Sequence, residues 1–147
     1  MRAMLLGVGG VGKTTLVYRL LGFSQRPSVT LRPGLYRLYL GRWVDVLDVP
    51  GQHAAEVAQA ASRLMTLYFD RVLAVYDVTR ADTLYALAEI LDALCQCAAA
   101  REVVVVGNKR DLAEELGYMV ENHLLPHRTY YVSALRDPPE ELLRLLL

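Results

Sequence analysis

The feature that most constrains this chain is a glycine-rich run near the N-terminus, Gly7-Val8-Gly9-Gly10-Val11-Gly12-Lys13-Thr14. It fits the pattern G-x-x-x-x-G-K-[ST] and lies between a short apolar run, Ala3–Leu6, and a segment of helical character, Thr14–Leu21. Glycines let a backbone wrap a phosphate with its N–H groups, and the start of the following helix adds a positive dipole end. In such a loop Lys13 would reach the β- and γ-phosphates, and the Thr14 hydroxyl would ligate Mg²⁺. The run therefore predicts a phosphate-binding loop between a strand and a helix.

The rest of the chain alternates between strand and helix patterns. Two alternating stretches, Leu35–Leu40 and Trp43–Asp48, flank Gly41-Arg42 and predict an antiparallel hairpin. Such alternation with buried, valine-rich strands predicts an α/β fold with parallel crossovers, in which ligands bind at the carboxyl ends of the strands. The remaining expectations are strands at Arg71–Val78, Val103–Val106 and Arg128–Val132, helices at Ala54–Tyr68, Asp82–Ala99 (with Asp82 as its cap) and Glu114–Leu124, a short helix from about Pro138, and a loop at Phe23–Gly34.

Composition excludes several classes of protein. Sixteen basic residues balance sixteen acidic ones, so no net charge draws the chain to nucleic acid or to anionic lipid. No apolar stretch approaches the roughly 20 residues that span a bilayer, and no lipidation motif is present. Cys95 and Cys97 are two positions apart in a helical segment, where side chains do not face each other. We interpret them as reduced thiols and expect a cytoplasmic protein without a direct membrane anchor.

Three further polar motifs follow predicted strands. Asp48-Val49-Pro50-Gly51 ends the hairpin, and there Asp48 can hold Mg²⁺ while the Gly51 N–H meets a γ-phosphate. Asn108-Lys109-Arg110-Asp111 follows the valine run; Asp111 can accept hydrogen bonds from N1–H and the exocyclic amine of guanine, which adenine does not offer. Taken alone, this motif fits a polar helix-capping turn equally well. Ser133-Ala134-Leu135 follows the last strand, and its backbone N–H could reach the guanine O6.

These four motifs, in this order, make the chain similar to the Ras-like small GTPases over essentially its whole length. Val75-Tyr76-Asp77-Val78-Thr79 also resembles the strand that Rab-type members carry at this place. The resemblance implies a P-loop three-layer sandwich, with a six-stranded, mostly parallel sheet that has one antiparallel edge strand and helices on both faces. It implies one GTP-binding domain over residues 1–147. Lacking a lipidation site, the chain looks most like the prokaryotic members.

Carried over residue by residue, the resemblance also implies a mechanism. Gln52 directly follows D-x-x-G, where the family keeps the glutamine that orients the attacking water. Thr30 is the chosen switch threonine for Mg²⁺, as the sole threonine between the first helix and the hairpin. Leu135 departs from the family, which has a lysine there. The implied catalytic residues are Gln52, Lys13 and Thr30; the nucleotide ligands are Gly9, Gly10, Val11, Gly12, Lys13, Thr14, Thr15, Gly51, Asn108, Lys109, Asp111, Ser133 and Ala134; the Mg²⁺ ligands are Thr14, Thr30 and Asp48.

The arginine that would neutralise transition-state charge has no fixed position. Arg26, Arg32 and Arg37 are candidates, and a partner could supply one in trans. The first function hypothesis is a slow GTPase switch, using GTP/GDP and Mg²⁺, whose two loops are read by a protein effector or an activating protein. The second is a GTP-loaded scaffold or complex subunit with little turnover. The third, a P-loop ATPase or small-molecule kinase, is disfavoured by Asn108 and Asp111.

Overall fold

A computed structural model of the chain describes residues 1–64, 68–94 and 100–147. Cys95 and Cys97, and the expected C-terminal end of the helix around them, lie outside these residues. A seven-stranded sheet runs through the molecule in the order β2-β3-β4-β1-β5-β6-β7. Its strands are β1 (Arg2–Leu6), β2 (Val29–Arg32), β3 (Leu35–Tyr39), β4 (Trp43–Asp48), β5 (Phe69–Asp77), β6 (Ala100–Asn108) and β7 (Thr129–Tyr131).

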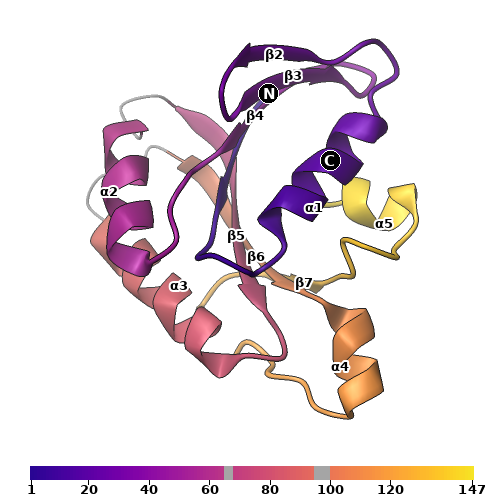
Figure 1. Cartoon of the computed structure of the whole chain (residues 1–147). Helices are drawn as coiled ribbons and strands as arrows, with labels where there is room; N and C mark the ends of the chain where they lie inside the picture. Colours follow the sequence, from indigo (N-terminus) through magenta and orange to yellow (C-terminus); the bar gives the residue numbers. More distant parts are fainter. Residues whose placement is uncertain (65–67, 95–99) are drawn as a thin grey trace.

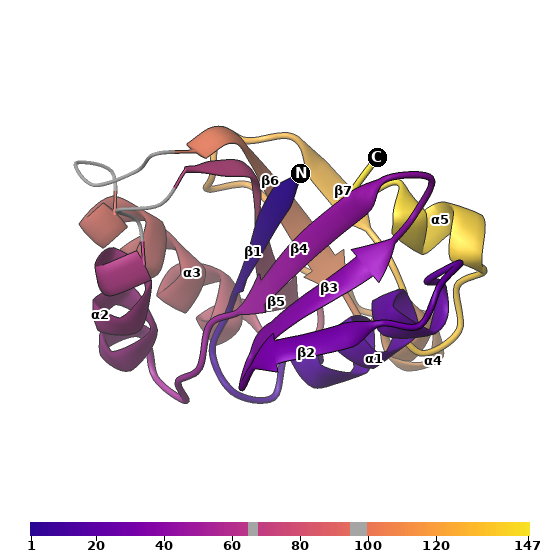
Figure 2. The same ribbon diagram turned by 90° about the horizontal axis from the view of Figure 1, so that it is seen from above.

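Helices cover both faces of this sheet. They are α1 (Lys13–Gly22), α2 (Ala54–Leu64), α3 (Ala81–Leu94), α4 (Arg110–Leu116) and α5 (Pro139–Leu143). Helices α1 and α5 lie on one face, and α2 and α3 on the other (Figures 1 and 2). The three-layer α/β sandwich expected from the sequence is therefore confirmed.

Successive side chains of β1 point to opposite faces of the sheet and pack against different helices. Ala3 and Leu5 pack with α1, whereas Met4 and Leu6 pack with α2 and α3. All four side chains are fully buried. The valine run of β6 is divided in the same way, because Val104 and Val106 join the α1 side. A strand buried on both faces needs apolar residues at every position, which explains its unbroken hydrophobic sequence.

The sheet has one strand more than expected. Residues expected to form a loop contain β2, which pairs antiparallel with β3 at Val29↔Arg37 and Thr30↔Tyr36. All four β2 residues are exposed, so no buried alternation marked this strand in the sequence. The expected hairpin of β3 and β4 is present, with Leu38 opposite Val44 and Tyr39 opposite Trp43. Strand β3 is antiparallel to β4, whereas β4, β1, β5 and β6 are parallel to one another.

Two helix expectations are corrected. The helix expected at Glu114–Leu124 is α4, which begins at Arg110 and ends before Gly117. Gly117 has φ +67°, a left-handed conformation that glycine adopts readily and that terminates a helix. Asp82 was expected to cap the following helix, but it lies within the first turn of α3, which begins at Ala81. An acidic side chain in the first turn still interacts favourably with the positive end of the helix dipole.

Candidate functional site

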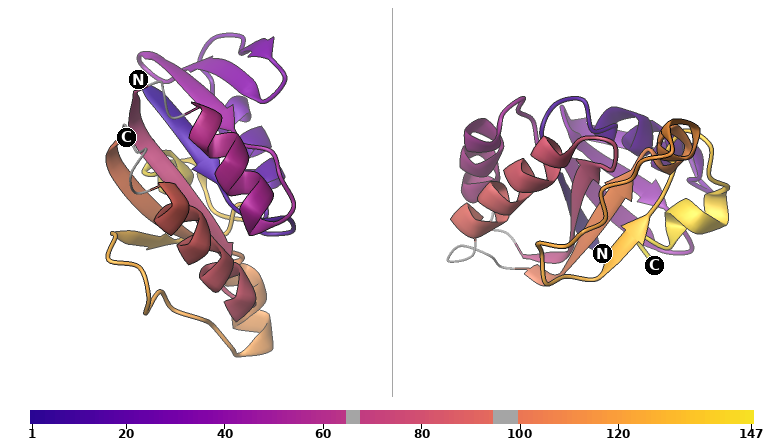
Figure 3. Two further views of the ribbon diagram at one scale, coloured as in Figure 1. Left: turned by 90° about the vertical axis from the view of Figure 1, so that its left-hand side faces the viewer. Right: turned by 90° about the horizontal axis from the view of Figure 1, so that it is seen from below.

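A cavity of about 520 Å³ opens where β1 and β4 end. Seen from below, this edge of the sheet carries the loops that enter α1, α2 and α3 (Figure 3). The position agrees with the rule that parallel sheets bind ligands beyond the carboxyl ends of their strands. The lining residues are Val8–Thr15 of the glycine-rich loop, Asp48, Pro50, Gly51, Gln52 and Lys109.

The glycine-rich loop takes backbone conformations that require glycine. Gly10 has φ +80° and Gly12 φ +93°, both in the left-handed region. Gly12 is also the N-cap of α1, so the free N–H groups of that helix begin at the cavity. A Cβ on Gly12 would collide with the Asn108 amide. The loop is thus tightly enclosed and presents backbone donors, as phosphate binding demands.

Lys13 points into this cavity and is paired within it. Its ammonium lies 2.9 Å from the Asp48 carboxylate and also donates to the Val49 carbonyl. The side chain is only 11% exposed, so its charge is compensated mainly by Asp48. Thr14 and Asp48 line the same cavity and offer a hydroxyl and a carboxylate oxygen. Oxygen ligands of this kind fit Mg²⁺, which proteins hold through one or two side chains together with substrate phosphates.

A second, smaller cavity of about 270 Å³ adjoins the first. The two share Gly12, Thr15 and Lys109, so a ligand can extend from one to the other. The second cavity is further lined by Asn108, Asp111, Leu112, Ala134 and Leu135. A lining of apolar side chains with one carboxylate suits a flat nucleobase that presents hydrogen-bond donors. The carboxylate of Asp111 also lies 3.5 Å from the Arg136 guanidinium, which is 68% exposed.

Asn108 joins the glycine-rich loop to the second cavity, which is called the base cavity below. Its side chain is 2% exposed; its Nδ2 donates to the Val11 carbonyl and its Oδ1 accepts from the Ala134 N–H, each at 2.9 Å. One amide therefore ties the loop after β1 to the loop after β7. Ala134 lines the second cavity, whereas the buried Ser133 does not.

The Ser133 loop is held by residues that sequence reasoning missed. Asp137, 5% exposed, accepts the Ser133 N–H at 2.9 Å and pairs with the Arg110 guanidinium. Arg19 of α1 donates to the carbonyls of Ala134 and Asp137 at 2.8 and 2.5 Å. Arg110 and Arg19 are distant in sequence from this loop, so no local pattern could have indicated their contacts with it.

Gln52 is placed against the phosphate loop. Its backbone carbonyl accepts the Gly9 N–H at 2.9 Å, and its side-chain amide lies where a Cβ of Gly9 would be. Thr30, by contrast, is exposed in β2 and does not line the cavity. None of the three candidate arginines lines it either: Arg37, for example, forms two hydrogen bonds with Asp45 at 2.7 and 3.1 Å.

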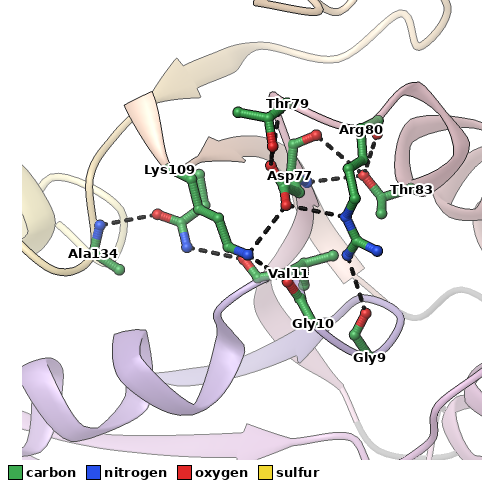
Figure 4. Close-up of polar contacts among 10 residues, drawn as sticks. Gly9, Gly10, Val11, Asp77, Thr79, Arg80, Thr83, Lys109 and Ala134 are labelled. Carbon is green, nitrogen blue, oxygen red and sulfur yellow. Dashed lines mark hydrogen bonds and ion pairs between the residues drawn. The ribbon is translucent and has the colours of Figure 1, made fainter. Parts of the chain in front are cut away.

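Asp77 and Arg80 form a second group that sequence reasoning missed. Asp77 ends β5 and is 1% exposed; the Arg80 and Lys109 side chains contact its carboxylate (Figure 4). Burial, the largest single influence, would raise the pKa of Asp77. Hydrogen bonds from the Thr79 side chain and backbone, together with Lys109, outweigh it and leave the pKa lowered. The carboxylate is therefore charged at neutral pH.

This fold and these paired cavities define a P-loop nucleotide-binding protein. The sequence matches the Ras family over residues 2–129, so the chain belongs to the Ras family. A search of curated protein sequences gives no match. Among solved structures, the chain is similar to the cytosolic domain of FeoB from L. pneumophila, with a TM-score of 0.68 and 21% identity. The alignment covers 99% of this chain and 70% of that one, and it supports the fold.

No helix among the described residues is long and apolar enough to cross a membrane. Nor do residues 1–64, 68–94 and 100–147 contain a cluster of three or more His, Cys, Asp or Glu side chains that could hold a metal by themselves.

Proposed function

We propose that residues 1–147 form one cytoplasmic GTP-binding domain that slowly hydrolyses GTP to GDP and phosphate and acts as a molecular switch. The observation that carries the proposal is the pair of adjoining cavities. One is lined by the phosphate loop and Lys13, the other by Asn108 and Asp111, and Lys109 lines both. A guanine nucleotide offers phosphates to the first and base donors to the second.

Each side chain then has a defined task. The loop N–H groups and Lys13 bind the phosphates, while Asp111 accepts from the guanine N1–H and amine. Lys109 covers the base with its apolar stem, since it lines both cavities. Thr14 and Asp48 would hold Mg²⁺, which supplies positive charge to neutralise the phosphate oxygens. Binding would thus give Lys13 and Asp48 separate partners in place of each other.

Hydrolysis would depend on Gln52, whose backbone is hydrogen-bonded to the phosphate loop. Its amide, beside Gly9, would orient a water for attack on the γ-phosphate. Thr30 would join the Mg²⁺ ligands only if β2 moved, because in this structure Thr30 is exposed on β2 and does not line the phosphate cavity. A protein that binds the two switch loops would then distinguish the GTP and GDP states.

The alternative is a GTP-loaded scaffold with little turnover. It is favoured by one observation: among the described residues that line the phosphate cavity, the cations are Lys13 and Lys109, with no arginine and without Thr30. Both hypotheses require nucleotide binding but differ in chemistry.

The deciding experiment is single-turnover release of phosphate from γ-labelled GTP with Mg²⁺, with ATP measured in parallel. We expect slow release from GTP and weak binding of ATP. Tight GTP binding without release would replace the switch with the scaffold. Equal affinities for ATP and GTP would contradict guanine recognition by Asp111.

A further inference from the structure

Three consecutive carbonyls of the phosphate loop each accept a hydrogen bond from a side chain outside the loop. Arg80 donates to Gly9 at 3.4 Å, and Lys109 donates to Gly10 at 2.7 Å. Asn108 donates to Val11 at 2.9 Å. The donors come from the ends of β5 and β6, so the loop after β1 is held by its neighbours in the sheet.

The geometry of the peptide unit turns these contacts into control of the N–H groups. In a trans peptide, the C=O of one residue and the N–H of the next point in opposite directions within one plane. Fixing the Gly9 carbonyl therefore fixes the N–H of Gly10, and fixing the Gly10 carbonyl fixes the N–H of Val11. Both N–H groups then point away from the side chains that hold the carbonyls, and both residues line the phosphate cavity.

Asp77 sets the direction of both cations. Its Oδ2 lies 3.2 Å from the Arg80 Nε and 3.1 Å from the Lys109 Nζ. Its Oδ1 accepts from the Thr79 N–H at 2.8 Å and from the Thr79 hydroxyl at 2.6 Å. The carboxylate is thus locked on one side and binds two cations on the other (Figure 4). The register of β5 and β6 explains why Asp77 reaches Lys109. Asp77 lies opposite Asn108, and Lys109 is the next residue after Asn108.

We propose that Arg80, oriented by Asp77, is a positioning residue for nucleotide binding: it holds the Gly9 carbonyl so that the Gly10 N–H faces the phosphates. The inference deepens the proposed function and rests on it. Arg80 does not line the phosphate cavity, and its side chain is 44% exposed, so it acts through the loop. Its guanidinium lies 3.0 Å from the place of a Cβ on Gly10, which puts it close against the loop backbone.

The side chains of Arg80 and Lys109 make different contacts, so the role of Arg80 can be tested separately. Lys109 also lines the base cavity, so changing it would affect both base and phosphate binding. Among the hydrogen bonds and ion pairs of the described residues, the Arg80 side chain contacts only the loop and Asp77. Changing Arg80 should therefore weaken phosphate binding while leaving base recognition intact.

The test compares the affinities of GDP, GTP and guanosine for the full chain and its variants, by competition with fluorescently labelled GDP. In Arg80→Gln, we expect GDP and GTP to bind about three- to tenfold more weakly, and guanosine to bind unchanged. Arg80→Lys retains the charge without the planar fork and should recover part of the loss. The control is Arg128→Gln, which breaks an exposed 2.7 Å pair with Glu102 away from both cavities and should bind all three ligands normally.

Each other outcome has a separate meaning. GDP affinity in Arg80→Gln equal to that of the unchanged protein overturns the positioning role alone. An equal loss for guanosine and GDP also overturns it, because that pattern indicates a general disturbance of the site. Failure of the unchanged protein to bind GDP or GTP overturns the proposed function and this inference together.

Discussion

The amide of Gln52 occupies the space where any side chain on Gly9 would have to go. The two residues are also joined through their backbones, because the Gly9 N–H donates to the Gln52 carbonyl at 2.9 Å. The loop after β1 and the loop after β4 therefore meet at this contact, on the rim of the phosphate cavity. Position 9 needs glycine because the Gln52 side chain approaches its backbone closely, and not because of an unusual φ, since the φ of Gly9 is not positive.

The first prediction concerns this contact. Gly9→Val would push the Gln52 side chain out of its position while leaving the phosphate loop able to bind nucleotide. Because a displacement of about 1 Å can cost about 100-fold in rate, we expect a fall in GTP hydrolysis of up to that size. Single-turnover phosphate release measures the effect.

The matched control for Gly9→Val is Gly22→Ala at the end of α1. A Cβ on Gly22 meets nothing within 4 Å, so hydrolysis should be unchanged there. Hydrolysis in Gly9→Val at the parent rate would remove Gln52 from the proposed mechanism, provided that GTP binding is retained.

Guanine selectivity gives the second prediction. Asp111→Asn removes the charged acceptor from the base cavity, and hydrogen bonds to charged groups contribute about 1.5–3 kcal/mol each. We expect GTP affinity to fall by about 10- to 100-fold, with ATP affinity little changed. Asp45→Asn, on the hairpin and outside both cavities, is the control. A parent-like preference for GTP over ATP in Asp111→Asn would exclude Asp111 as the guanine-reading group.

The site motifs could be predicted from the sequence because each is local. The glycine run between a strand and a helix and the polar residues after β4 and β6 all lie where the sequence placed them. Thr30 has no motif around it and is the sole threonine of its segment, and it does not line the cavity. Strand β2 was missed for a related reason: its four residues are exposed and are defined by pairing with β3.

Contacts between segments far apart in the sequence could not be predicted from the sequence. The Arg80–Gly9 hydrogen bond joins residues 71 positions apart. It depends on β5 lying beside β1, with Ala74 opposite Leu6, and no local pattern contains the order of strands. The Asp77 segment resembled a known strand in sequence, yet its task in holding two cations depends on that packing.

The third prediction follows from the lowered pKa of Asp77. A carboxyl whose pKa is lower in the folded state than in the unfolded state stabilises the fold above its unfolded pKa. That stabilisation is lost as the pH falls through the lower, folded value. Asp77→Asn should therefore reduce the free energy of unfolding at pH 7, by about 1–3 kcal/mol for a buried hydrogen-bonded charge. The difference from the parent protein should begin to shrink below about pH 4, where the Asp77 carboxyl of the unfolded chain becomes protonated.

Urea unfolding of the parent and Asp77→Asn between pH 3 and pH 7 measures this difference. Asp45→Asn is the comparison for an exposed pair, because the Arg37 side chain that binds Asp45 is 45% exposed. An exposed pair contributes about 0–1 kcal/mol. A gap between the parent and Asp77→Asn that stayed constant across the whole range would show that the charge of Asp77 is not what stabilises the fold.

The last prediction concerns Thr30 and the edge strand that carries it. For Thr30 to reach Mg²⁺, β2 must change its position, and its few backbone pairs with β3 and its exposed side chains make separation from β3 inexpensive. We expect the β2 amides to exchange hydrogen differently in the GDP-bound and GTP-analogue-bound protein. The β4 amides, which pair on both sides, should exchange equally in the two states. Thr30→Ala should abolish the difference at β2 without lowering the stability of the GDP form, because the side chain is exposed. If β2 exchanged identically in both states, Thr30 would not be a switch residue, and the scaffold hypothesis would gain accordingly.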